Sequence, residues 1–146
     1  MKIRKICWVS LVFALLCAPL VFAQTTKPNP GNFDRFVQQV YTGEGQKTIR
    51  PESRRYAFMK ECFENRISFI TSDKDKLANA NFKRLSDIPL FNHYNKALMR
   101  DAGFDPATFN PFKYHLGFYE KETQVIHVDG TNYLIVIAPQ TSAADR

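Results

Sequence analysis

The chain has few of the residues on which small disulfide-rich or metal-binding domains depend. Its 146 residues include three cysteines, three histidines and one tryptophan. Two of the cysteines, Cys7 and Cys17, and the tryptophan, Trp8, fall near the N-terminus. Cys62 is the single cysteine of the remaining sequence, which excludes an internal disulfide framework there.

The chain also lacks the short motifs of common catalytic and nucleotide-binding sites. It contains no Gly-x-Ser-x-Gly nucleophile elbow. Residues 43–48, Gly-Glu-Gly-Gln-Lys-Thr, resemble a phosphate-binding loop, but a glutamine separates the second glycine from the lysine, and the run follows an expected helix instead of a strand. Carboxylate pairs for glycoside hydrolysis would have to come from turns, where acids are normally solvated. We therefore predict no catalytic residue and no cofactor.

Positive charge is present but not gathered into a stripe. The formal net charge is +6, and three of the basic residues, Lys2, Arg4 and Lys5, lie in the first five positions, so the sequence beyond them carries +3. The basic residues of 54–60 alternate with glutamates of 52–64. Because nucleic-acid binding needs a clustered basic surface, we predict no nucleic-acid partner.

Long hydrophobic runs are confined to the N-terminus. Residues 6–22 carry no charge, follow three basic residues and lead to Ala23, the pattern of a secretory signal peptide. We expect residues 1–23 to be this peptide, with cleavage after Ala23, export to the periplasm or beyond, and no membrane span after cleavage. Two alternatives remain: an uncleaved anchor, for which the run is short, and a lipid anchor at Cys17, which the large Leu16 before it disfavours.

The remaining sequence is long enough for one domain. Residues 24–31 are polar and proline-containing and predict a linker, residues 32–140 predict a single domain, and residues 141–146 predict a flexible tail. Within the domain, apolar residues recur at helical spacing over 33–41, and a second helix is expected over 51–65 after a proline.

The middle of the domain mixes strand and helix patterns. Residues 67–71 are rich in β-branched and aromatic side chains and predict a strand. The polar segment 72–85 predicts a loop with one helical turn. Apolar residues four apart over 89–103 predict a further helix that begins near a proline and ends near a glycine.

The last third alternates between apolar and polar residues. Segments 112–119, 123–128 and 133–138 predict three antiparallel strands, with a turn at 120–122 and another at Asp129-Gly130. The third is apolar at every position, which indicates a strand covered on both faces. We therefore predict an α+β fold in which N-terminal helices pack on a C-terminal antiparallel meander of three to four strands.

Two motifs carry a resemblance to known proteins. Phe109-Asn110-Pro111 and the run Val-Asp-Gly-Thr-Asn-Tyr at 128–133 resemble a set of small exported bacterial proteins of unknown function, over the C-terminal third of the chain. The resemblance implies a bacterial exported domain and no activity. The order of the elements is also similar to the cone-shaped nuclear transport factor two-like fold, whose sheet is curled, and this is the alternative fold.

One face of the predicted meander is polar and aromatic. Lys113, His115 and Tyr119 share a face of the 112–119 strand, and a three-residue turn would place His115 opposite His127 at about 5 Å, close enough to share a metal. A two-residue turn would place the two histidines on opposite faces. Because no third ligand is evident and zinc needs three or four, we predict no metal site. These four residues form the candidate binding face.

The leading functional hypothesis is a non-enzymatic exported domain that binds an unidentified protein or ligand through the sheet, and a homodimer is compatible with it. The alternative is a small cofactor-independent enzyme or small-molecule binder. Its aromatic pocket would lie in a curved sheet and be lined by Tyr114, Phe118 and Tyr133. Cys62 falls on the apolar side of the second helix and is predicted to be a buried core residue rather than a nucleophile.

Overall fold

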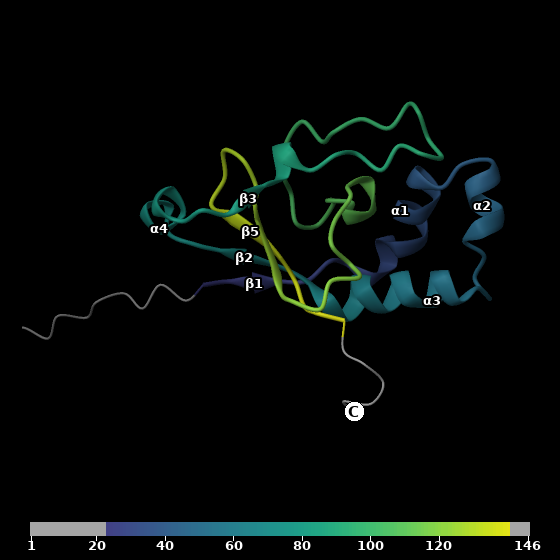
Figure 1. Ribbon diagram of the computed structural model, residues 1–146, viewed down its shortest axis with the longest axis horizontal. Coiled ribbons are helices and arrows are strands. Elements are labelled where there is room, and N and C mark those ends of the chain that lie inside the picture. Colours follow the sequence, from purple (N-terminus) through teal and green to yellow (C-terminus); the bar gives the residue numbers. More distant parts are fainter. Residues whose placement is uncertain (1–22, 141–146) are drawn as a thin grey trace, which may run out of the picture.

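The computed structural model describes residues 23–140. The predicted signal peptide before Ala23 and the predicted tail at 141–146 lie outside the described residues. Three helices gather at one end of the sheet and the fourth lies at the other (Figure 1). Within the described range, no helix has the length and apolar character needed to cross a membrane. The helices are α1 (Phe33–Val40), α2 (Glu44–Thr48), α3 (Arg54–Glu61) and α4 (Lys74–Asn79).

A five-stranded open sheet has the strand order β1-β2-β5-β4-β3. All neighbouring strands are antiparallel except β3 and β4, which are parallel. The α+β class, with helices preceding an antiparallel sheet, is therefore confirmed, and β5 is the central strand. The strands are β1 (Thr25–Thr26), β2 (Ile67–Thr71), β3 (Lys83–Arg84), β4 (Gln124–His127) and β5 (Tyr133–Ile137).

The core lies on one face of the sheet. Phe69, Ile135 and Ile126 occupy neighbouring positions on β2, β5 and β4, and their exposed fractions are 0%, 0% and 3%. Side chains two apart on a strand share a face, so these residues form one apolar row. Helix α1 buries the residues that its spacing predicts, and they join the same core cluster: Phe33, Phe36, Val37 and Val40.

The second predicted helix is present as α3, which continues as a π-helical turn, η2 (Cys62–Arg66), directly into β2. The buried guanidinium of Arg66 donates to the carbonyls of Ala138 (3.0 Å) and Phe118 (2.7 Å) and to the Cys62 sulfur (2.9 Å). Arg66 thus ties the helix end to the end of β5. Cys62 is fully buried, as predicted, and burial raises the pKa of its thiol to about 11.

The strand predicted over 112–119 is wrong. A 3₁₀ turn, η4 (Pro111–Lys113), is followed by two hydrogen bonds between residues two apart, from Leu116 N–H to Tyr114 C=O (2.8 Å) and from Phe118 N–H to Leu116 C=O (2.9 Å). Such bonds are typical of γ-turns. Burial still alternates along the segment, so the period-two pattern that suggested a strand has a different backbone beneath it.

The helix predicted over 89–103 is also wrong. Leu90 instead forms an isolated antiparallel bridge with Tyr114. The loop is held by tertiary hydrogen bonds, among them one from the Arg100 guanidinium to the Leu85 carbonyl (3.0 Å). The apolar residues of this segment pack into the core from an irregular backbone, because long-range bonds satisfy polar groups that a helix would have satisfied locally.

The segment expected to be a linker, 24–31, contributes strand β1, whose Thr25 and Thr26 pair with β2. Pro28 in the same segment is buried. The helical turn expected within 72–85 is present as α4, whereas the short strand β3 has no counterpart in the sequence analysis.

Candidate functional site

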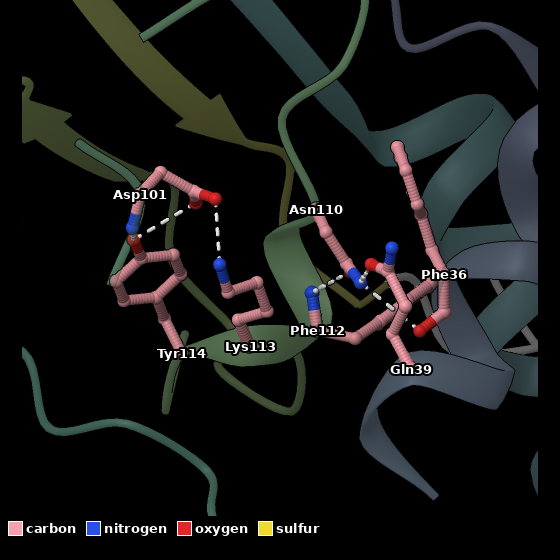
Figure 2. Close-up of polar contacts among 7 residues, drawn as sticks. All are labelled: Phe36, Gln39, Asp101, Asn110, Phe112, Lys113 and Tyr114. Atoms are coloured by element: carbon pink, nitrogen blue, oxygen red, sulfur yellow. Dashed lines mark hydrogen bonds and ion pairs between the residues drawn. The ribbon is translucent and has the colours of Figure 1, made fainter. Parts of the chain in front are cut away.

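Lys113, one of the four residues of the predicted binding face, is engaged in an ion pair. Its ammonium lies 2.6 Å from the Asp101 carboxylate, and its side chain is 12% exposed. The Tyr114 hydroxyl donates to the other carboxylate oxygen at 3.0 Å, and Figure 2 shows both groups directed at Asp101. Lys113 therefore serves to hold the 89–110 loop against η4.

His127 and His115 are not on adjacent strands. His127 lies on β4, beside Leu134 of β5, and its Nε2 lies 3.0 Å from the Thr131 carbonyl oxygen. The backbone N–H of His115 instead donates to the carbonyl of Pro89. The hairpin that would have placed the histidines opposite each other is absent because residues 112–119 form no strand. Among residues 23–140, no group of three His, Cys, Asp or Glu side chains is arranged to hold a metal ion.

His115 and Tyr119 are brought together at one apolar pocket of about 180 Å³, which we call the aromatic pocket. Four separate parts of the chain form it: Tyr41 directly after α1, the helix α3, Phe91 of the 89–103 loop and the segment 112–119. Its floor consists of buried side chains, namely Met59, Phe112, Tyr114 and Leu116.

Aromatic rings form the walls of the aromatic pocket. Phe58 and Tyr119 stack with their ring centroids 4.7 Å apart and their planes inclined by 12°. The rings of Tyr41 and Phe91 lie 5.6 Å apart, and the His115 ring meets the edge of Phe91 at 5.1 Å. Tyr119 is 66% exposed, so it forms part of the mouth.

Helix α3 supplies three lining residues because of their spacing. Arg55, Phe58 and Met59 stand at i, i+3 and i+4, and such residues share one side of a helix. Met59 is buried at the floor, Phe58 is half-buried in the wall and Arg55 is exposed at the mouth. The helix thus places a charge at the solvent end of an apolar surface.

The electrostatics of the mouth are set by Arg55. Its guanidinium donates to the Tyr41 hydroxyl at 3.3 Å and lies 5.4 Å from the centre of the Tyr41 ring. Burial raises the pKa of Tyr41 by more than Arg55 lowers it, so the hydroxyl stays protonated at neutral pH. No Asp or Glu lines the aromatic pocket, and Arg55 forms no ion pair within the described part of the chain.

Two of the three residues that were expected to line a pocket in a curved sheet lie at the aromatic pocket. Tyr114 and Phe118 line the aromatic pocket, whereas Tyr133 lies in β5 and packs against Phe104 with ring centroids 5.1 Å apart. The pocket lies between α3 and the 112–119 segment rather than within a curved sheet. The sequence analysis missed Arg55 and Phe91, although the i, i+3, i+4 spacing that includes Arg55 could have indicated the first.

The search of protein-family models finds no match to this chain, and neither the search of curated proteins nor that of solved structures finds a similar protein. The functional argument therefore rests on the geometry of the aromatic pocket.

Proposed function

We propose that this chain is a binding protein for a small molecule whose apolar part, about the size of one aromatic ring, enters the aromatic pocket. The volume of about 180 Å³ supports this size. A cavity of roughly 150 Å³ lined by apolar side chains holds one benzene molecule, whereas drug-sized ligands occupy about 300 to 1,000 Å³. The pocket is therefore too small for a nucleotide or a two-ring compound to enter completely.

The composition of the lining supports binding without chemistry. Its floor and walls are aromatic or aliphatic apart from the His115 ring, and Arg55 and Tyr119 lie at the mouth, so few polar groups accompany an apolar surface, as is usual for a small-molecule site. Cys62, the one cysteine of the described chain, is buried and does not line the pocket. We accordingly propose binding rather than catalysis.

The location of the protein is part of the same proposal. The pattern of residues 1–23 supports export, so the ligand would be met in the periplasm or outside the cell. The earlier hypothesis of a protein partner on the sheet stays a prediction, as does a homodimer.

The expected affinity follows from ligand size. A ring with one small substituent has about eight non-hydrogen atoms, and small ligands gain about 0.5 to 0.7 kcal/mol per atom, between the limits for the smallest and for drug-sized ligands. The total of about 4 to 5.5 kcal/mol corresponds to a Kd between about 0.1 and 1 mM. A natural ligand with further contacts would bind more tightly.

Methionine methyl NMR provides the test, because the described chain contains a reporter and a reference. Met59 lines the aromatic pocket, whereas Met99 is 75% exposed and lies outside it. Benzyl alcohol, benzoate and benzylammonium are titrated separately into methyl-labelled protein. We expect at least one to shift the Met59 resonance saturably while Met99 stays unchanged. If Met59 does not move with any of them up to about ten times the expected Kd, or if both resonances move alike, the proposed function is wrong.

Two variants locate the binding. Tyr119→Ala removes one wall of the mouth and should weaken binding about fivefold, since about 1 kcal/mol of apolar contact is lost. Met99→Ala removes a large exposed apolar side chain outside the pocket and should leave the Met59 titration unchanged. Equal effects of the two variants would place the ligand elsewhere.

A further inference from the structure

The mouth of the aromatic pocket offers hydrogen-bond donors and positive charge. Arg55 has five N–H donors, and the Tyr41 hydroxyl accepts one of them. The hydroxyl proton of Tyr41 remains to be donated, and the Tyr119 hydroxyl is exposed at the same mouth. Because no carboxylate lines the pocket, nothing there neutralises the guanidinium.

We propose that the ligand of the aromatic pocket is an aromatic oxyanion, a molecule with one ring that fills the pocket and a carboxylate or similar acidic group held by Arg55 and Tyr41. This inference rests on the proposed function and adds the charge of the ligand to it. The planar guanidinium presents paired N–H groups that match the two oxygens of a carboxylate. The ring would then point toward Met59 and Phe112 at the floor.

Two contacts with Tyr41 restrain the guanidinium of Arg55 without a ligand. Its guanidinium is held over the Tyr41 ring, a cation–π contact, and by the hydrogen bond to the same residue. Tyr41 itself is 4% exposed and packs against Phe91 and Tyr94. A donor that is held in place by a buried ring loses less conformational freedom on binding than a free surface arginine.

A cationic ligand is the main competing class, because aromatic walls also attract ammonium groups. The charge of Arg55 disfavours a cationic ligand, because the charged group of the ligand would lie at the mouth, beside a side chain of the same charge. A neutral ligand would leave the free donors of Arg55 to water, at little cost but with no gain. The oxyanion is therefore the class that uses both the charge of Arg55 and the hydroxyl of Tyr41.

The three ring compounds named above share one ring and differ in charge, so they test the inference separately. We expect benzoate to bind about fivefold to tenfold more tightly than benzyl alcohol, a modest preference because Arg55 is exposed to solvent. Benzylammonium should bind most weakly, and the preference for benzoate should shrink as salt is added. Similar affinities for all three, or a preference for benzylammonium, would overturn the inference and leave the proposed function in place.

Matched arginine variants assign the preference to one side chain. Arg55→Gln should abolish the preference for benzoate over benzyl alcohol, and Arg55→Lys should keep only part of that preference because lysine cannot pair with both oxygens. Arg54→Gln removes the same charge from the adjacent position of α3, outside the pocket lining, and should keep the preference. A preference that survives Arg55→Gln, or is lost equally with Arg54→Gln, would refute the role of Arg55. Binding of no probe by the wild-type chain would instead refute the proposed function.

Discussion

Replacing Asn110 with alanine removes only a small side chain but should destabilise the protein strongly. The side chain is 2% exposed and makes three hydrogen bonds. Its amide nitrogen donates to the Phe36 carbonyl (3.0 Å) and to Gln39 Oε1 (2.9 Å), and its oxygen accepts from the Phe112 N–H (3.0 Å), as Figure 2 shows. Asn110 therefore joins helix α1 to the 3₁₀ turn η4.

The magnitude follows from these bonds. Each contributes about 1 kcal/mol net, and the Phe112 N–H would be left buried without its acceptor, so Asn110→Ala should lower the free energy of unfolding by about 3 kcal/mol. For a domain of this size, about 4 °C of melting temperature is lost per kcal/mol, so the Tm should fall by about 12 °C. Gln39→Met removes one bond at an exposed residue and should cost less than about 1 kcal/mol.

Urea unfolding followed by circular dichroism measures both variants, with the slope of free energy against urea as a check on two-state behaviour.

Asn110→Asp tests the two hydrogen bonds that the Asn110 amide nitrogen donates. The introduced carboxyl would keep the bond from Phe112 but, when ionised, would face the Phe36 carbonyl, so its folded-state pKa should be raised above the unfolded value of about 3.9. Its destabilisation should therefore be small below about pH 4 and grow as pH rises. A loss under about 1 kcal/mol for Asn110→Ala, or a pH-independent effect of Asn110→Asp, would refute the account.

Two further predictions concern packing and alkaline stability. A Cβ added at Gly45 would lie 2.7 Å from Cγ and 2.9 Å from Cβ of Tyr94, so Gly45→Ala should lower the free energy of unfolding by about 1 kcal/mol despite its better helix propensity. A Cβ added at Gly103 would meet no atom within 4 Å, so Gly103→Ala should be neutral or slightly stabilising. Equal effects of the two variants in urea unfolding would contradict this prediction. Burial raises the pKa of Cys62 from 9.0 to about 11, and the hydrogen bond to Asp34 raises that of Tyr56 from 10.0 to about 12, so the protonated forms favour the fold. The free energy of unfolding, measured in urea, should stay constant up to about pH 9 and fall progressively above it. In Cys62→Ala the fall between about pH 9 and 11 should be less steep. A wild-type free energy that does not change above about pH 9 would show the prediction to be wrong.

The sequence predicts correctly those elements whose apolar pattern is compatible with only one kind of secondary structure. Helix α1 has a single apolar stripe, and β2 and β5 are runs of β-branched residues, so each is found where expected. The two incorrect predictions, a strand over 112–119 and a helix over 89–103, concern segments in direct contact through the bridge of Leu90 with Tyr114. Periodicity reports which side chains are buried, whereas the backbone that buries them depends on local turns in 112–119 and on tertiary hydrogen bonds in 89–103.

For the candidate site, the sequence predicts the types of residue involved but not their arrangement in space. The predicted binding face consists of Lys113, His115, Tyr119 and His127 on a sheet. The structure brings His115 and Tyr119 to the aromatic pocket, pairs Lys113 with Asp101 and places His127 on β4. The contribution of α3 to the opposite wall of the pocket was not expected. Arg55 has the sequence context of a solvated helix face. Its spacing from Phe58 and Met59 indicates a shared side of the helix, and the fold adds that this side faces a pocket.

The segment that forms the pocket wall belongs to no strand and meets the 89–103 loop at one isolated bridge, and two buried polar side chains hold its ends. Asn110 fixes its beginning to helix α1, and Arg66 fixes its end by donating to the Phe118 carbonyl at 2.7 Å. Between these points the backbone bonds mostly to itself, which leaves Tyr114, Leu116 and Phe118 directed at the core and the pocket. Its strand-like contact is the bridge of Leu90 with Tyr114, and the backbone bonds beside it, from Phe91 N–H to Lys113 C=O (2.8 Å) and from His115 N–H to Pro89 C=O (3.0 Å), bring Phe91 to the pocket.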